Sequence, residues 1–80
     1  MKLVTESVFE TDAALSVYRS LLPEIESQVT DRSSIDLRPE GSYLYLTVEA
    51  DDLVSMRSTL NTWLRLIQVA LEVSALADNS

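Results

Sequence analysis

Two adjacent carboxylates, Asp51 and Asp52, form the pair of side chains whose spacing is closest to that of a divalent-metal or acid–base site. They stand directly before an apolar run that begins at Leu53. An aspartate in that position accepts the free N–H groups of a first helical turn and interacts favourably with the positive end of the helix dipole. We therefore predict that one of the two caps a helix, and we predict no metal site.

A polar strip follows on the same helix. Arg57, Asn61 and Arg65 recur every four residues, a spacing that places them on one helix face. Such a strip suits nucleic-acid phosphates or the carboxylates of a partner. The alternative is a solvated face on which Arg65 pairs with Asn61 or Glu72. The net charge of -7 repels RNA, so we expect contact with RNA only within an assembly whose other members are basic.

The remaining residues favour no catalytic reaction. The chain has no histidine and no cysteine, so its serines and threonines lack the usual general base and no thiol nucleophile exists. A single glycine, Gly41, excludes a glycine-rich phosphate loop. Tyr43 and Tyr45 lie on one side of a predicted strand, where aromatic rings can stack nucleobases, but Arg38 is the one cation near them. We predict cross-strand packing for the tyrosines, no enzymatic activity and no cofactor.

Apolar periodicity divides the chain into five elements in the order β-α-β-β-α. Alternation and β-branched residues predict strands over 2–9, 34–39 and 43–50, and a three-to-four-residue period predicts helices over 12–29 and from 53 to about 75. We expect Pro23 to kink the first helix or to end it near Leu22. Residues 76–80 are predicted to fray. The whole chain, residues 1–80, is then one domain.

This order predicts an α+β fold, in which a three-stranded antiparallel sheet has both helices packed on one face. The last strand lies in the centre, and the two open edges favour pairing with a second copy. The first strand leaves its inward set open. Two alternating sets of residues could face the helices. One set is Leu3, Thr5, Ser7 and Phe9, and the other is Val4, Glu6 and Val8.

Composition and length narrow the cellular setting. A chain of 80 residues buries only about 60% of the surface that its unfolded form exposes, so a partner would stabilise it. No signal sequence precedes the first strand, and no run reaches the roughly 18 apolar residues of a membrane span. We expect a cytoplasmic protein with no membrane association. Its 13 acidic residues and single lysine, Lys2, fit a salt-rich cytoplasm.

The final helix has two apolar faces. One broad sector suits packing on the sheet and on the first helix; its members are Leu53, Met56, Leu60, Trp63, Leu64, Ile67, Ala70 and Leu71. A second cluster, the outer stripe, consists of Leu66, Val69, Val73 and Leu76. Its full burial is worth about 6–12 kcal/mol at roughly 1.5–3 kcal/mol per side chain. We predict that the outer stripe binds helices of another protein; the alternative is that it covers a loop or the C-terminal tail.

Two segments resemble the Pcc family, the small subunit of the archaeal and eukaryotic KEOPS complex. The segment "EADDLVSMRSTLNTWLRLI" is similar to that family's final helix through Ala50, Asp52, Arg57, Leu60, Asn61, Leu64 and Arg65. It departs from the family pattern at Met56 and Trp63, where a leucine and a tyrosine are usual. The segment "AALSVYRSLLPEI" is similar to the first helix through Ala14, Tyr18, Ser20, Leu21, Pro23 and Glu24.

The resemblance implies a homodimeric, non-catalytic subunit of an archaeal KEOPS complex. In that family the helices pack against the catalytic threonylcarbamoyltransferase, the Kae subunit. The complex adds threonylcarbamoyl to the adenosine beside the tRNA anticodon. A Bud-type kinase and a Cgi subunit are its other members, with which we expect only indirect association.

Two other functions are open at this point. One is a small KH-like RNA-binding module, which needs a GXXG loop and a basic surface, and the sequence has neither. The other is a dimerisation domain of some other enzyme, which would share the fold but not the two motifs.

Overall fold

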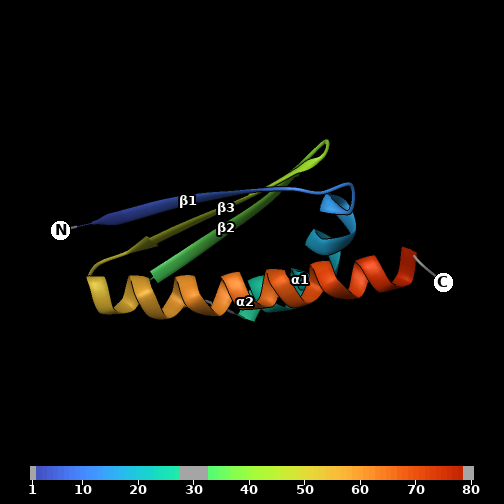
Figure 1. Ribbon diagram of the computed structural model, residues 1–80. Helices are drawn as coiled ribbons and strands as arrows, with labels where there is room; N and C mark the ends of the chain where they lie inside the picture. The colour runs from blue at the N-terminus through green and yellow to red at the C-terminus, as the bar shows by residue number, and fades with distance from the viewer. Residues whose placement is uncertain (1, 28–32, 79–80) are drawn as a thin grey trace.

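The computed structural model describes residues 2–27 and 33–78, and within them the chain follows the predicted order (Figure 1). Two helices and three strands succeed one another as β1 (Leu3–Glu10), α1 (Ala14–Ser27), β2 (Ser33–Glu40), β3 (Tyr43–Ala50) and α2 (Leu53–Asp78). Both helices lie on one face of the sheet. The predicted α+β fold is therefore confirmed.

The two helices extend further than two of the predictions allowed. Helix α1 continues through Pro23 to Ser27, so of the two effects expected of Pro23, a kink or an end near Leu22, the end is wrong. Helix α2 continues to Asp78, past the end predicted near Ala75, so the first residues of the predicted frayed tail are helical. The predicted C-terminal end of the first helix, at Val29, lies outside the described residues.

The sheet has the order β1-β3-β2, with β3 antiparallel to both neighbours. Gly41 and Ser42 form the two-residue connection of the β2–β3 hairpin, because Glu40 pairs with Tyr43. Gly41 has a φ of 58°, a left-handed value that costs a residue with a Cβ free energy, and it is the one such residue among those described. The same turn is fixed to β1 by the Thr11 N–H, which donates to the Ser42 carbonyl over 2.8 Å.

The core lies between the sheet and the two helices. Its buried members are Ala14, Val17, Leu21, Leu37, Leu44, Leu46, Val48, Ala50, Met56, Trp63 and Ile67. On β1 the half-buried residues are Leu3, Thr5, Ser7 and Phe9, which settles the alternation that the sequence left open. Leu53 was expected to face the core, and that expectation is wrong: it is 53% exposed. It is the first residue of α2, where the chain has only just left the end of β3.

Asp52 caps helix α2, as predicted for one of the two aspartates. Its side-chain Oδ1 accepts the Ser55 N–H over 2.7 Å, and its carbonyl accepts the first helical bond from Met56 over 3.0 Å. Asp51 is exposed. Asp52 therefore has a structural role in starting the helix.

We expect Asp52→Ala to lower the free energy of unfolding by about 1 kcal/mol, because the first-turn N–H of Ser55 loses its acceptor. In a domain of this size that corresponds to a fall in the melting temperature of about 4–8 °C. Thermal unfolding followed by circular dichroism measures it. Asp51→Ala is the matched control, expected to stay within about 0.5 kcal/mol of the parent. Equal effects of the two substitutions would show that Asp52 contributes only its charge.

Candidate protein-interaction surface

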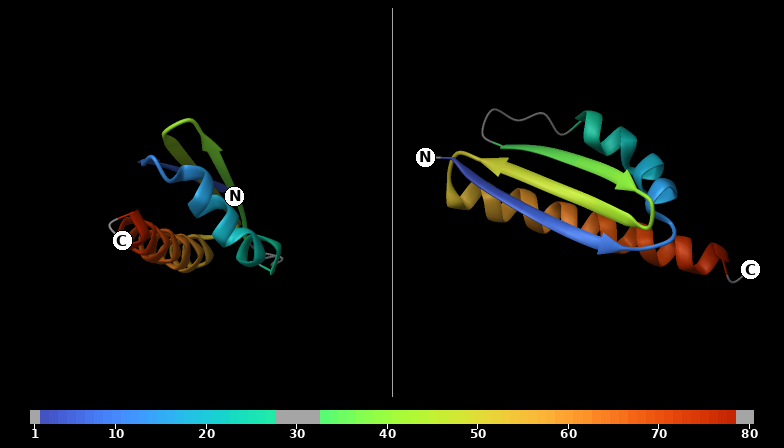
Figure 2. Two further views of the ribbon diagram at one scale, coloured as in Figure 1. Left: turned by 90° about the vertical axis from the view of Figure 1, so that its right-hand side faces the viewer. Right: turned by 90° about the horizontal axis from the view of Figure 1, so that it is seen from above.

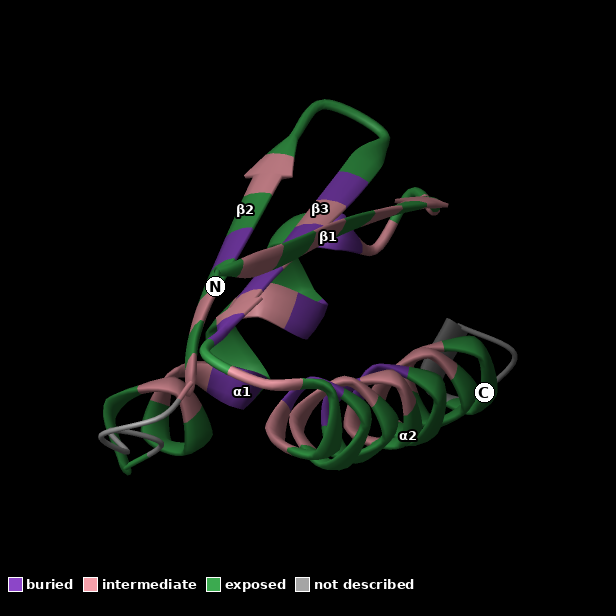
Figure 3. Ribbon diagram, turned by 90° about the vertical axis from the view of Figure 1, so that its left-hand side faces the viewer, coloured by how far each residue is buried: buried purple, intermediate pink, exposed green. Residues whose placement is uncertain are grey.

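The outer stripe is largely uncovered in the structure. Val69, Val73 and Leu76 are 53%, 60% and 72% exposed, respectively. Figure 3 shows the exposed residues of α2 on the side turned away from the sheet. The chain's own described atoms therefore leave more than half of each of these three side chains uncovered. The alternative, in which they cover a loop or the C-terminal tail, concerns residues that lie largely outside the described ones.

The outer stripe is exposed because it lies opposite the face of α2 that packs on the core, and the unequal lengths of the elements add to the exposure at its C-terminal end. Helix α2 has 26 residues, about 39 Å at 1.5 Å per residue. Each strand has 8 residues, about 27 Å at 3.4 Å per residue. The helix starts at one end of the sheet, so its C-terminal turns project beyond the strands (Figure 2). Val73 and Leu76 belong to those turns and have no sheet above them.

Leu66 differs from the rest of the outer stripe. It is half-buried and packs against the core cluster. It also lines a shallow depression on α2 together with Asn61, Thr62 and Arg65. Leu66 thus joins the core to the outer stripe, and its substitution would disturb both. Tests of the surface are cleaner when they use Val69, Val73 and Leu76.

The predicted polar strip lies beside the outer stripe on the same helix. Arg57, Asn61 and Arg65 are all exposed. Within residues 2–27 and 33–78, neither arginine makes an ion pair, so the suggested pairing of Arg65 with Glu72 is absent there. The depression that Asn61 and Arg65 share with Leu66 brings polar and apolar side chains into one surface. A partner that covers the outer stripe would reach these polar groups too.

Sequence reasoning missed two other exposed apolar side chains on the helices. Val54 is 78% exposed and Leu15 is 50% exposed, and neither was assigned to a partner surface. Val54 follows the capping aspartate by two residues, a position that is in the first helical turn and was treated as part of the helix start. At 100° per residue, Val54 lies on the side of the helix opposite the core-facing residues, and this position could have predicted its exposure.

Other kinds of site have little support in the described residues. They contain no group of three or more aspartate, glutamate, histidine or cysteine side chains placed to hold a metal ion. No helix among them combines the length and apolar character needed to cross a bilayer. Tyr43 and Tyr45 pack on each other with ring centroids 6.4 Å apart, and the Arg38 guanidinium lies 5.3 Å from the Tyr45 ring centroid.

Comparison with known proteins agrees with the two sequence motifs. The family model described as "Transcription factor Pcc1" matches residues 2–75. The chain is also 44% identical over 72 residues to the "KEOPS complex subunit Pcc1" of Pyrococcus abyssi, a match that covers 90% of this chain and 87% of that protein. The match includes both helices and all three strands. The chain therefore belongs to the Pcc1 family.

Proposed function

We propose that this chain is a non-catalytic subunit of a KEOPS complex, acting in the cytoplasm. In this proposal its helices bind the catalytic threonylcarbamoyltransferase, the Kae subunit, and so support threonylcarbamoylation of the adenosine beside the tRNA anticodon. The observation that carries the proposal is the exposed apolar surface on α2 of a chain whose relative is a KEOPS subunit. The Bud-type kinase and the Cgi subunit are reached through the catalytic subunit.

The energetics favour a protein partner over solvent for this surface. Val69, Val73 and Leu76 each have more than half of their surface exposed. Burying this apolar surface beneath a docked helix would contribute about 1 kcal/mol of binding free energy for each side chain. Burial of the neighbouring, half-buried Leu66 would add to this gain. Association entropy opposes binding, which is why one side chain alone would not hold a partner but several together do.

A non-catalytic role is supported by the side-chain inventory. The sequence has no histidine and no cysteine, and Asp52 of its acidic pair caps a helix. Homodimerisation is supported by the sheet, in which β1 and β2 each have one neighbouring strand and one open edge. Strand pairing across an edge would leave both helices of each copy available for the catalytic subunit.

Mixing the chain with a purified threonylcarbamoyltransferase subunit tests the proposal. We expect a complex whose mass, measured by sedimentation, contains two copies of this chain, and we expect tRNA modification by the reconstituted complex to increase when the chain is added. A mixture that sediments as two separate species would contradict the proposal. Complex formation with an unrelated enzyme instead would support a dimerisation domain of that enzyme.

The polar strip gives a separate prediction. In the assembled complex, we expect Arg57→Ala with Arg65→Ala to weaken tRNA binding about tenfold and to lower the slope of log affinity against log salt by about 1.5, because each lost phosphate contact removes about 0.7–0.9. Filter binding over a salt series measures both. Arg19→Ala, an exposed cation on α1, is the control.

An unchanged slope would show that the strip does not contact tRNA. The isolated chain is expected to give no tRNA shift in a gel, because its net charge of -7 repels phosphate. Tight binding by the isolated chain would instead favour the KH-like module.

A further inference from the structure

The face of the sheet that is turned away from the helices has no role in the proposed function. Alternate residues of all three strands lie on it, and the pairing of the strands arranges them in rows. From one end to the other these rows are Val4–Glu49–Ser34, Glu6–Thr47–Asp36, Val8–Tyr45–Arg38 and Glu10–Tyr43–Glu40. We call this surface the outer sheet face. It is on the opposite side of the domain from the outer stripe, as Figure 3 shows for the sheet and α2.

Apolar and aromatic side chains on the outer sheet face come from the edge strand β1 and from the start of the central strand β3. Val4 is 57% exposed, Val8 is 52% exposed and Tyr43 is 44% exposed. Tyr45 is half-buried, because Tyr43 lies against it on one side and the Arg38 guanidinium lies over its ring. An antiparallel sheet commonly leaves one face to water, but that face then carries polar residues in alternation. Here both positions of β1 that flank Glu6 are valines.

The charged side chains on the outer sheet face are mostly negative. The rows contain the carboxylates Glu6, Glu10, Asp36, Glu40 and Glu49 and one cation, Arg38. A second cation, Lys2, directly precedes β1. Both cations already have partners on the face. Lys2 Nζ lies 3.1 Å from Glu49, and Arg38 Nε lies 3.5 Å from Asp36. The excess of carboxylates is therefore not neutralised within the face.

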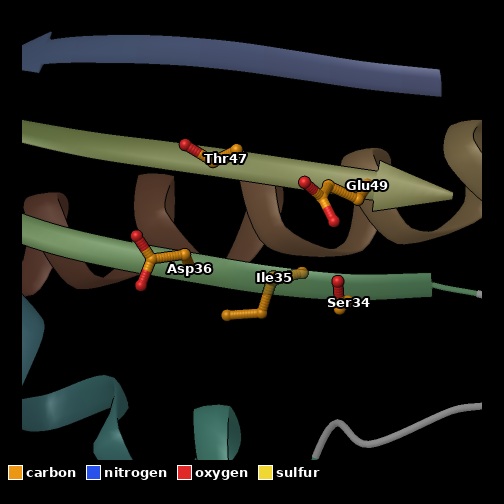
Figure 4. A pocket seen from close by; sticks show the side chains of 5 residues that line it. All are labelled: Ser34, Ile35, Asp36, Thr47 and Glu49. Carbon is orange, nitrogen blue, oxygen red and sulfur yellow. The ribbon is translucent and has the colours of Figure 1, made fainter. Parts of the chain in front are cut away.

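Two of the carboxylates share a depression. Ser34 and Asp36 of β2 line it with Thr47 and Glu49 of β3, together with Ile35, and it encloses about 280 Å³ (Figure 4). Asp36 and Glu49 occupy diagonal positions on neighbouring strands, about 7–8 Å apart at Cα. A carboxylate has about four acceptor positions, so each can accept a further donor beside its present ion pair. The hydroxyls of Ser34 and Thr47 supply additional acceptors.

We propose that the outer sheet face binds a basic segment of a partner protein, one whose contact side alternates arginine or lysine with apolar residues. The apolar side chains of the segment cover Val4, Val8 and the tyrosines. A guanidinium enters the depression between Asp36 and Glu49, where its planar fork of donors can reach both carboxylates.

Charge decides between this partner and the alternatives. A second copy of the chain would bring its own excess of carboxylates against this one, and such like-charge contact opposes association. Nucleic acid is disfavoured for the same reason, although Tyr43 and Tyr45 offer aromatic rings. A basic, partly apolar protein segment is complementary both to the negative charge of the outer sheet face and to its apolar side chains, Val4, Val8 and the two tyrosines. It would bind without displacing a partner from α2.

The probe for this proposal is a fluorescein-labelled ten-residue peptide of alternating arginine and valine, titrated with the full chain at about 0.15 M salt. A peptide of the same composition, with five arginines followed by five valines, controls for charge alone. We expect the alternating peptide to bind more tightly than the block peptide. We also expect its amide chemical-shift changes on the protein to lie on β1, β2 and β3.

The variant Asp36→Asn with Glu49→Gln is expected to weaken binding of the alternating peptide about fivefold, because it removes two exposed ion pairs, each of which contributes little free energy. The matched control is Glu24→Gln with Glu72→Gln, which removes the same charge from exposed positions on the two helices and should change binding less than twofold. Val8→Ser removes apolar surface and leaves the net charge unchanged, and we expect it to weaken binding too. Equal losses from the two charge-removing pairs, equal binding of the two peptides, or shift changes confined to the helices would overturn the proposal.

Discussion

Replacing Val69, Val73 and Leu76 together by serine is expected to weaken binding to the catalytic subunit by about 150-fold. The three side chains are 53–72% exposed and would each lose about 1 kcal/mol of apolar burial in the complex, and 3 kcal/mol corresponds to that factor. The fold should persist, because valine and serine have similar helix propensities and none of the three side chains belongs to the buried core. Isothermal titration calorimetry measures the affinity, and circular dichroism measures the unfolding.

The matched control for this variant is Gln68→Ser with Glu72→Ser, two exposed positions on the polar side of the same helix. It changes the helix to a similar extent without removing apolar surface, so we expect affinity within about threefold of the parent, as for rim contacts that carry little binding energy. A triple variant that folds and binds as tightly as the parent would show that the outer stripe is not the interface.

The substitution Trp63→Ala is expected to lower the free energy of unfolding by about 3–5 kcal/mol. Trp63 is 0% exposed and heads the fully buried side chains by volume. It stands between α2 and the strands, so its removal leaves a cavity that the rigid sheet cannot close. The free energy of unfolding of a domain is about 5–15 kcal/mol in total, and a chain of 80 residues buries a smaller fraction of its surface than a larger domain does. Urea unfolding followed by circular dichroism measures the loss.

Trp63→Phe separates packing from polarity at the same position. Within the described residues the indole Nε1 is buried and has no hydrogen-bond acceptor. Phenylalanine removes this unpaired donor, whose burial costs about 1–3 kcal/mol, and leaves a smaller cavity than alanine. We therefore expect a loss of less than about 2 kcal/mol. A variant Trp63→Ala that loses less than 1 kcal/mol would contradict the assignment of Trp63 to the centre of the core.

Much of the fold could be predicted because the chain alternates cleanly. Leu44, Leu46 and Val48 alternate with polar and aromatic residues, and all three are buried on the central strand. The β1 alternation was ambiguous, since valines and a phenylalanine compete for the inside. Only the pairing of β1 with β3 decides it, because the pairing places Val4 beside Glu49 and Val8 beside Tyr45. The outer sheet face was missed for this reason.

Helix ends were harder to predict than helix faces. Pro23 lacks an N–H and removes one helical bond, yet α1 continues for four residues beyond it. Tertiary packing explains this, since Leu21 is buried before the proline and Ile25 packs against the core after it. For α2 the period placed Val69, Val73 and Leu76 outside, as found, but it could not show that Leu66 reaches the core.

The claim that the outer stripe is the docking surface is tested most directly by its accessibility in the complex. The chain has no cysteine, so Val73→Cys and Glu6→Cys each introduce a single reporter thiol, the first on the outer stripe and the second on the outer sheet face. The rate of maleimide labelling is measured for the free chain and with saturating catalytic subunit. We expect labelling at position 73 to slow at least about tenfold on binding, as the thiol becomes buried beneath helices, while position 6 changes less than about twofold. A complex of confirmed mass in which position 73 labels as fast as in the free chain would contradict the account.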